Sequence, residues 1–324
     1  MNKILKVVLV VLGVILVAII GIGWYVKKAL PNVGPASDLT VQVTPGRLER
    51  GRYLCNNVAA CVVCHSSRDS LLYSEPLLSG TIGKGGELFG HSEGLPGEIY
   101  ATNITPYSLG KWSDGELFRA ITTGVSRDGH ALFPLMNYPA YGKLDQEDIY
   151  SIIAYIRSLP SITNDVPATE LDFPLNFIVN TIPAKAQLVS RPDAGDSVGY
   201  GKYLVRMASC VDCHTQVDKG KFVAGMEFAG GRDFSAAGRT PLFSANITPD
   251  KETGIGNWTR ELFIQKFKQY QDSGYVPRKV AAGEANTPMP WMAFAGMEEK
   301  DLSAIYAYLR TIKPITHLVQ KGRQ

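Results

Sequence analysis

The chain has 324 residues, of which 45% are hydrophobic and 19% charged, a composition typical of a globular protein with room for two domains of ordinary size. Lys and Arg number 33 and Asp and Glu 30, which leaves a formal net charge of only +3. With so small an excess and no run rich in Lys and Arg, the sequence gives no reason to expect nucleic acid as a partner.

The N-terminal segment, residues 1–29, is predicted to be a membrane anchor. Its stretch 7–26 contains no charged residue, and twenty helical residues span about 30 Å, the thickness of a bilayer's hydrocarbon core. Trp24 and Tyr25, followed by two lysines, are typical of the boundary between lipid and water. A long cleaved signal peptide is the alternative interpretation.

The rest of the chain contains the same series of motifs twice. RGRYLCNNVAACVVCH (50–65) matches YGKYLVRMASCVDCH (200–214), which is one residue shorter, and ATNITP (101–106) matches SANITP (244–249). IIAYIRSLP (152–160) matches IYAYLRTIKP (305–314), in the same order. Such self-similarity indicates a duplicated domain. The boundaries that we predict are a spacer at 30–44, domain 1 at 45–162, a linker at 163–193, domain 2 at 194–315 and a tail at 316–324.

Each copy is predicted to be mainly helical. Its last element carries an apolar stripe at positions i, i+3, i+4 and i+7, formed by Ile149, Ile152, Ile153 and Ile156 in the first copy and by Leu302, Ile305, Tyr306 and Leu309 in the second. Asp145 is the predicted N-terminal cap of the first of these helices. Further helices are expected from about Arg47 and Ser197 and after Trp112 and Trp258. Long glycine-rich loops join them, and such loops are uncommon unless they wrap something.

The two CxxCH motifs, Cys61-Cys64-His65 and Cys210-Cys213-His214, predict covalent haem c. In such a motif two thiols add to the haem vinyl groups and the histidine becomes an axial ligand of the iron. A thioredoxin-like redox pair would need a βαβ context that is missing, and it would leave both histidines unexplained. One zinc site made from both motifs would require the two domains to meet face to face. We therefore expect two covalently attached haem c groups.

Covalent attachment of this kind takes place outside the cytoplasm. The predicted location is therefore the inner membrane, crossed once, with the N-terminus in the cytoplasm and the haem domains in the periplasm.

The second axial ligands are predicted to be methionines. Domain 2 offers no histidine besides His214, and thioether sulfur is the remaining soft ligand. When the last helices are aligned at an offset of 153, Met136 pairs with Met289, whereas Met292 and Met297 have no methionine counterpart. Core filling is the ordinary alternative for a methionine. His91 and His130 are rival ligands in domain 1, but they have no counterparts and are predicted to lie at the surface.

Cys55 is the fifth cysteine and lies outside both motifs. The repeat aligns it with Val205, an apolar position of the first helix. We therefore predict a buried, unreactive thiol rather than a redox site.

Taken together, the motifs CVVCH and CVDCH, the stretch NITPDKETGIGNW (246–258) and the methionine segment with its closing helix resemble the membrane-anchored multihaem cytochrome c family. That family includes the cytochrome subunits of periplasmic alcohol, aldehyde and gluconate dehydrogenases. The resemblance covers about 45–315 and implies two tandem cytochrome c-like helical domains. It also implies electron transfer from a partner dehydrogenase to quinone, a downstream cytochrome or an oxidase. Several of those subunits carry three haem motifs, whereas this chain has two.

The predicted function is a membrane-tethered electron carrier without substrate chemistry of its own. Partners would be redox proteins, namely a dehydrogenase or a quinol-oxidising complex on one side and a cytochrome or terminal oxidase on the other. The enzyme alternative is a dihaem cytochrome c peroxidase, which would need one iron that can open a site for peroxide. A structural subunit of a respiratory complex and a haem-based gas sensor are further alternatives.

Overall fold

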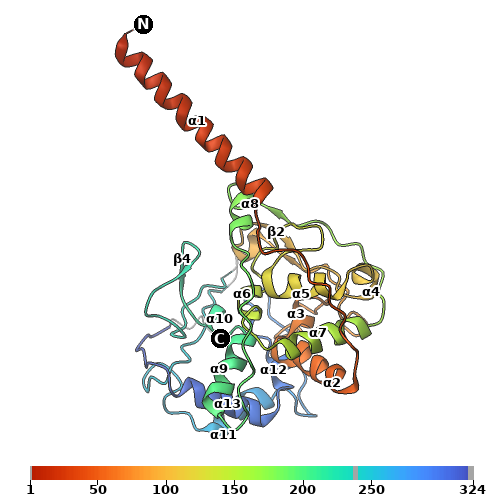
Figure 1. Cartoon of the computed structure of the whole chain (residues 1–324). Coiled ribbons are helices and arrows are strands. Elements are labelled where there is room, and N and C mark those ends of the chain that lie inside the picture. The colour runs from red at the N-terminus through yellow and green to blue at the C-terminus, as the bar shows by residue number, and fades with distance from the viewer. Residues whose placement is uncertain (1, 236–239, 320–324) are drawn as a thin grey trace.

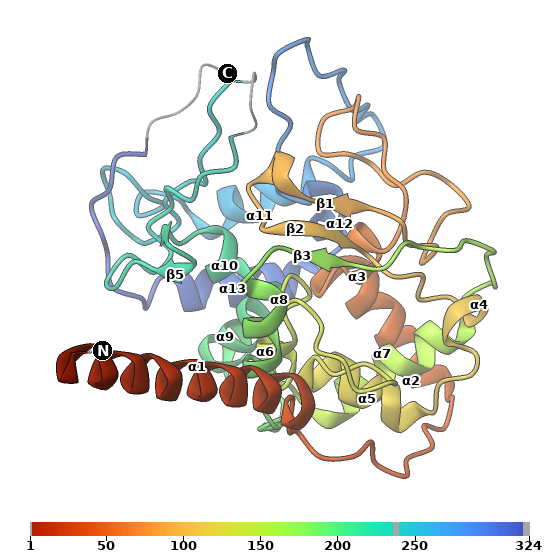
Figure 2. The ribbon, with the colours of Figure 1, turned by 90° about the horizontal axis from the view of Figure 1, so that it is seen from above.

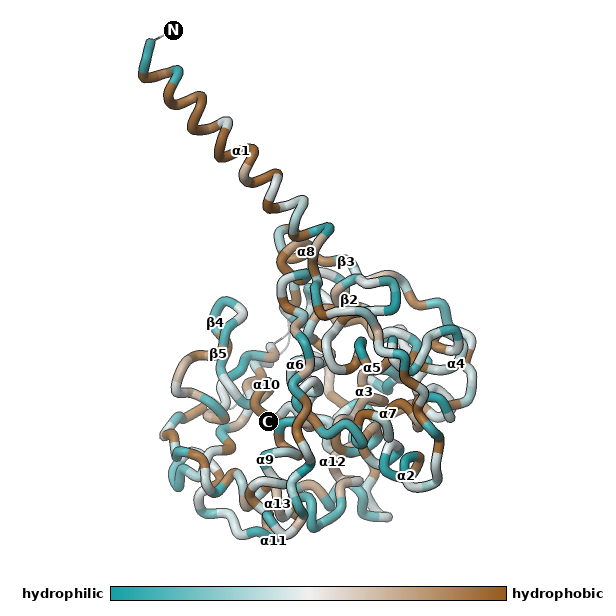
Figure 3. The backbone as a smooth tube through the Cα atoms, viewed as in Figure 1, coloured by the Kyte–Doolittle hydropathy of each residue, from teal (hydrophilic) through white to brown (hydrophobic). Residues whose placement is uncertain are grey.

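The computed structural model describes residues 2–235 and 240–319; parts of predicted domain 2 and of the predicted tail, and residue 1, lie outside this description. Helix α1 (Lys3–Ala29) projects from the body of the protein (Figure 1) and is apolar along most of its length (Figure 3). Among the described residues it is the one helix long and apolar enough to cross a membrane. A membrane anchor and a signal sequence share that property.

The body of the protein is mainly helical, as predicted. The first repeat contains α2 (Pro45–Tyr53), the π-helix η1 (Leu54–Val58), α3 (Cys61–Cys64), α4 (Pro106–Leu109), α5 (Asp114–Thr123), α6 (Tyr138–Tyr141) and α7 (Gln146–Ser158). The second repeat contains α9 (Ser197–Met207), α10 (Cys210–Cys213), α11 (Arg260–Lys268), α12 (Trp291–Ala295) and α13 (Glu299–Leu309). The two repeats lie side by side, the first in orange to lime and the second in green to blue (Figures 1 and 2).

The strands are short, and they attach the linker to the first repeat. β1 (Leu88–Phe89), β2 (Gly97–Tyr100) and β3 (Glu170–Leu171) form an antiparallel sheet in that order, in which Gly97 pairs with Leu171. The linker continues through α8 (Leu175–Ile178) and the 3₁₀ turn η3 (Val179–Thr181). The first repeat also has the 3₁₀ turn η2 (His91–Glu93), and the second has the hairpin β4 (Val217–Asp218) and β5 (Lys221–Phe222).

The last helix of each repeat buries its predicted apolar stripe. All four isoleucines of α7 are buried, as are Leu302, Ile305 and Leu309 of α13, and each such side chain contributes about 1.5–3 kcal/mol when it is removed from water. Tyr306 is partly buried and donates a hydrogen bond to the Trp258 carbonyl, 2.7 Å away. Helix α7 begins after Asp145, whose carboxylate accepts from the Glu147 N–H as a cap should.

In each repeat a glycine lets the first helix cross the last one closely. A Cβ on Gly51 would lie 1.9 Å from the Ser151 carbonyl oxygen, and a Cβ on Gly201 would lie 1.9 Å from the Ala304 carbonyl oxygen. No larger residue fits at either point, because real Cβ atoms do not approach a carbonyl so closely. The two crossings, α2 with α7 and α9 with α13, are therefore built in the same way.

The one-residue difference between the repeats appears as the π-helix η1. The Ala59 N–H donates to the Leu54 carbonyl five residues earlier, at 2.8 Å, which is the π pattern. Helix α9 has no such turn at the equivalent place. The π-helix thus accommodates the extra residue before the cysteine motif. Both motifs therefore follow the first helix of their repeat with the same backbone geometry.

The repeats contact each other through a reciprocal pair of buried hydrogen bonds. The Tyr53 hydroxyl of the first repeat donates to Asp301 Oδ2 of the second, and the Tyr203 hydroxyl of the second donates to Asp148 Oδ2 of the first, each at 2.7 Å. Each hydroxyl also accepts from a backbone N–H at the start of the last helix of the other repeat. Tyr53 accepts from the Glu298 N–H at 3.0 Å, and Tyr203 accepts from the Asp145 N–H at 3.1 Å. The interface therefore has approximate two-fold symmetry.

Candidate haem sites

Each CxxCH motif forms a single helical turn that follows a left-handed residue. Ala60 precedes α3 with φ 51°, and Ser209 precedes α10 with φ 57°. Residues three apart in a helical turn lie on one face, so the two thiols of each motif point to the same side. None of the five cysteines forms a disulfide, so the four motif thiols are available for attachment of haem.

The motif histidines are held in the tautomer that can ligate iron. His65 Nδ1 lies 2.7 Å from the Thr102 carbonyl oxygen, and His214 Nδ1 lies 2.8 Å from the Ala245 carbonyl oxygen. A carbonyl only accepts, so each Nδ1 carries the proton and each Nε2 keeps a free lone pair. Burial lowers the pKa of both imidazoles, against the opposing effect of the carbonyl bond, and favours the neutral form that binds metal.

A second hydrogen bond, from a glycine, fixes the backbone of each motif histidine. The Gly85 N–H donates to the His65 carbonyl at 2.9 Å, and the Gly230 N–H donates to the His214 carbonyl at 2.8 Å. These glycines have φ of +66° and +73°, and a Cβ on either would lie within 2.6 Å of the backbone that presents the carbonyl to Nδ1. Only glycine suits these positions, because any other residue would be strained by the positive φ and its Cβ would clash with that backbone.

The NIT stretch forms the turn that supports this carbonyl. Asn103 Oδ1 accepts from the Thr105 N–H at 2.9 Å and from its hydroxyl at 2.7 Å, and Asn103 Nδ2 donates to the Ile162 carbonyl at 2.8 Å. The second repeat makes the same bonds, with the same distances, through Asn246, Thr248 and Ile315. The polar side chains are thus used within the protein, and their role is to hold the histidine loop.

The two candidate methionines occupy equivalent places. Met136 lies two residues before α6 and Met289 two residues before α12, and each carbonyl accepts from the first N–H of that helix, at 2.6 and 2.8 Å. Both side chains are half-buried, whereas Met207 and Met297 are fully buried in the core. A thioether that is not enclosed by other side chains remains free to act as a ligand.

The motif thiols differ in their exposure to solvent. Cys64 and Cys213 are accessible to solvent, yet the surrounding protein desolvates them and raises the pKa of Cys64 to about 11. Two thiols, one exposed and one partly buried, and one free imidazole nitrogen in each motif form the donor set that a covalent haem c requires. The residues present therefore fit the group. Among residues 2–235 and 240–319, no three His, Cys, Asp or Glu side chains gather as a metal site, which gives the zinc interpretation no support.

The remaining candidate ligands lie where the sequence predicted. His91 pairs with Asp172 at 2.9 Å and His130 pairs with Asp128, and both imidazoles are more than 60% exposed. Cys55 is 1% exposed, and burial raises the pKa of its thiol well above the ordinary value. The surface position of the two histidines and the buried thiol are confirmed.

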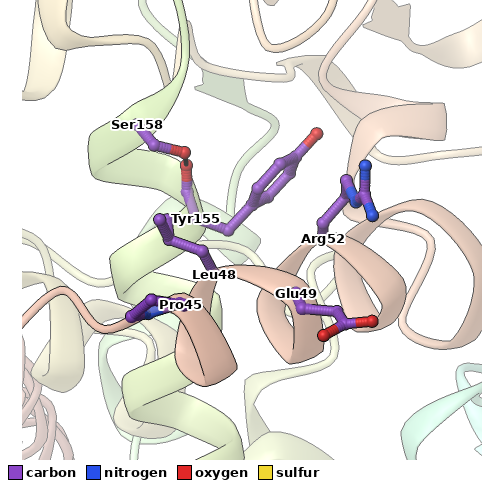
Figure 4. A pocket seen from close by; sticks show the side chains of 6 residues that line it. All are labelled: Pro45, Leu48, Glu49, Arg52, Tyr155 and Ser158. Carbon is purple, nitrogen blue, oxygen red and sulfur yellow. Dashed lines mark hydrogen bonds between the residues drawn. The ribbon is translucent and has the colours of Figure 1, made fainter.

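Two surface pockets lie away from both motifs. The first, of about 370 Å³, lies between α2 and α7 and is lined by Pro45, Leu48, Glu49, Arg52, Tyr155 and Ser158 (Figure 4). The second adjoins it and reaches Glu298 of the second repeat. Neither is lined by a motif cysteine, a motif histidine or a candidate methionine, so neither pocket is part of the candidate haem sites.

Comparison with known protein families and curated proteins gives matches to cytochromes, among them one family model and three proteins. Residues 198–313 match the cytochrome c family model. The cytochrome subunit of fructose dehydrogenase from Gluconobacter japonicus is 28% identical over 82% of this chain and 52% of its own length. The gluconate 2-dehydrogenase cytochrome c subunit of Pantoea cypripedii is 25% identical over 84% and 60%. A dihaem c-type cytochrome of Cereibacter sphaeroides is 24% identical over 79% and 82%.

The matches cover only part of the dehydrogenase subunits and, for the family model, only part of this chain. The chain spans between half and three fifths of the length of the two dehydrogenase subunits. The family model covers the second repeat, including Cys210, Cys213 and His214. The chain therefore contains a cytochrome c domain and is homologous to the cytochrome c subunits of sugar and sugar-acid dehydrogenases and to a dihaem c-type cytochrome.

Proposed function

We propose that this protein is a membrane-tethered dihaem electron carrier built from two tandem cytochrome c domains. The observation that carries the proposal is the equivalence of the two motif histidines. Each has Nδ1 bonded to the carbonyl that precedes an NIT turn and its backbone carbonyl bonded to a glycine N–H, with distances that agree within 0.1 Å. A chain that builds the same histidine support twice is suited to two haem groups of the same kind.

In this proposal Cys61 and Cys64 hold the first haem and Cys210 and Cys213 hold the second. The axial pairs are His65 with Met136 and His214 with Met289. A bound haem of this type takes up and releases one electron at its iron. The hydrogen bonds of His65 and His214 keep each imidazole neutral and oriented, and together with Met136 and Met289 these residues would close both axial positions, which would favour electron transfer over binding of oxygen or peroxide.

The partners follow from the homologues. Cytochrome subunits of dehydrogenases are among them, so we propose that a dehydrogenase donates electrons to this chain. A quinol-oxidising complex is the alternative donor, and a cytochrome or terminal oxidase is the proposed acceptor. We further propose that α1 crosses the inner membrane with its N-terminus in the cytoplasm, which holds both haem domains in the periplasm. N-terminal sequencing of the mature protein tests this, because a cleaved signal would remove α1.

The axial assignment is tested with Met136→Ala and Met289→Ala in the full chain. Each variant should keep both haems attached and lower one of the two potentials, because thioether ligation stabilises Fe(II). The fall should be a clear fraction of the roughly 0.8 V over which axial ligands set haem potentials. A redox titration with visible spectra measures it. If neither variant changes a potential, the assignment is wrong, and rapid oxidation by peroxide in the unmodified protein would favour the peroxidase.

A further inference from the structure

We propose that the methionine segment of each repeat is positioned by the other repeat, with Ser74 as the residue that positions Met289. The methionine segments are residues 135–138 and 288–291. The inference rests on the proposed function, in which Met136 and Met289 are axial ligands. It adds that the ligand geometry of each iron site depends on residues of the neighbouring repeat.

Ser74 of the first repeat is bonded directly to the second methionine segment. Its hydroxyl donates to the Met289 carbonyl at 2.8 Å and accepts from the Trp291 N–H at 3.1 Å. The side chain is 8% exposed, and its backbone is left-handed with φ 61°. One buried hydroxyl therefore bonds both backbone groups on either side of the turn after Met289, the Met289 carbonyl and the Trp291 N–H.

The loop that carries Ser74 is itself tied to the second repeat. The Tyr73 N–H donates to the Arg278 carbonyl and the Val280 N–H donates to the Leu71 carbonyl, both at 2.8 Å. Asn286 Oδ1 accepts from the Ser74 N–H at 3.0 Å. In Figure 2 this orange loop lies beside the blue loop that leads to α12. Ser74 is thus held by several bonds and cannot turn away from Met289 alone.

The first methionine segment is tied to the second repeat in turn. Asn137 follows Met136 directly, and its Nδ2 donates to Ser209 Oγ at 2.9 Å and to Asp212 Oδ2 at 2.6 Å. Ser209 precedes Cys210, and Asp212 lies between the two cysteines of the second motif. The residue next to one methionine therefore contacts the haem-attachment turn of the other repeat.

Hydrogen bonds within the same repeat do not replace these bonds. Among the described residues, the hydrogen bonds of both segments within their own repeat reach no more than a few positions along the chain, such as the Met289 N–H to Thr287 Oγ1 at 3.2 Å. Methionine has three rotatable side-chain bonds, so its sulfur is placed only as well as its backbone is. Packing within each repeat also holds these segments, since Tyr138 is buried against α5 and Trp291 stacks on Tyr270. The long-range hydrogen bonds to each segment come from the other repeat.

The test is Ser74→Ala in the full chain, with added imidazole as a competing ligand for ferric iron. The equilibrium constant for replacement of the second repeat's methionine should rise about tenfold, the factor that one ordinary hydrogen bond represents. The potential of the same haem should fall, while the first haem keeps its constant and its potential. Loss of the charge-transfer band of thioether-ligated ferric haem reports the replacement. Met136→Ala and Met289→Ala assign the two signals.

The controls separate positioning from general loss of stability. Ser151→Ala removes a buried hydroxyl of the first repeat that donates to the Glu147 carbonyl at 2.7 Å and, in the part of the chain that the structure describes, makes no bond to the second repeat, so both constants should stay unchanged. Ser74→Gly suits the left-handed backbone and should reproduce Ser74→Ala if the alanine variant folds poorly. Asn137→Ala should raise the constant of the first haem instead.

Two results would overturn the inference, and they are distinguishable. If Met289→Ala removes the band of the second haem but Ser74→Ala and Ser74→Gly leave its imidazole constant within twofold of the unmodified protein, Ser74 does not position the ligand. If Met289→Ala leaves both bands intact, the axial assignment itself fails, and the inference fails with it.

Discussion

The two repeats place an aspartate at the same point of their last helix but surround it differently. Asp148 accepts from Arg50 at 2.9 Å and Arg191 at 2.8 Å, in addition to the hydroxyl of Tyr203. Asp301 accepts from the Tyr53 hydroxyl and, at 3.5 Å, from that of Tyr200. Its Oδ1 is buried without a hydrogen-bond partner among the described residues.

Two arginines, Arg50 of the repeated motif and Arg191 of the linker, produce this difference. RGRY of the first copy aligns with YGKY of the second, so Arg50 stands where the second copy has Tyr200. Burial alone would raise the pKa of Asp148, but the hydrogen bonds and charges of its two arginines hold that pKa below its ordinary value. Burial raises the pKa of Asp301, and the Tyr53 bond only partly opposes it. The same fold position thus carries an ion cluster in one repeat and a poorly compensated carboxyl in the other.

The largest expected effect falls on a feature that the repeats share. Gly51→Ala and Gly201→Ala each place a methyl group 1.9 Å from a carbonyl oxygen of the opposing helix. Each should lower the free energy of unfolding by about 3 kcal/mol, at the upper end of the cost of overpacking. Chemical denaturation measures it, with Gly46→Ala as the control because a Cβ there meets nothing within 4 Å. A small loss in either variant would mean that the helix crossings are not equivalent.

The next prediction separates the repeats. Asp148→Asn should cost about 3 kcal/mol at pH 7, because it leaves Arg50 and Arg191 beside a neutral group. Asp301→Asn should change stability by less than about 1 kcal/mol, since the amide can still accept from Tyr53 and, among the described residues, no basic side chain forms an ion pair with Asp301. Denaturation of both variants under the same conditions makes the comparison. Equal losses would show that the difference in charge surroundings has no energetic consequence.

The pH dependence of these two variants provides an internal check. A carboxyl whose pKa is depressed on folding contributes stability that is present above its unfolded pKa, about 3.9, and is lost as the pH falls through the folded value. Asp148 is of this kind. The pKa of Asp301 is shifted in the opposite direction, so its contribution to stability is present in acid and is lost as the pH rises through its folded pKa. The difference in the free energy of unfolding between Asp148→Asn and Asp301→Asn should therefore become smaller at acid pH.

A smaller effect is expected from the reciprocal hydroxyls. Tyr53→Phe should cost about 2 kcal/mol, because Asp301 then keeps only the long bond from Tyr200. Tyr203→Phe should cost about 1 kcal/mol, because both arginines still satisfy Asp148. Thermal unfolding of the two variants should rank them in this order, and the reverse order would contradict the assignment of the arginines as the main partners of Asp148.

The features that the sequence revealed are those with a local signal. Spacing identified the CxxCH motifs, periodicity identified the stripes of α7 and α13, and a turn residue identified the Asp145 cap. Alignment of the repeats placed Cys55 on a buried position and set Met136 opposite Met289.

What the sequence did not reveal are contacts between residues far apart in the chain. The bonds of Tyr53 to Asp301 and of Ser74 to Met289 join positions separated by 248 and 215 residues, and no periodicity reports such pairs. One signal was available for the first, since both copies keep the tyrosine of G-x-Y and the aspartate of the last helix. Ser74 has no repeated counterpart that would have drawn attention to it.

The most direct test of the account is the mass of the intact, mature protein after purification under denaturing conditions. Two tandem cytochrome c domains predict a polypeptide that carries the mass of two haem groups, and Cys64→Ser or Cys213→Ser should impair attachment in one repeat only. A protein that carries a single haem, or none, would contradict the claim that both halves of the chain are built around the same cofactor.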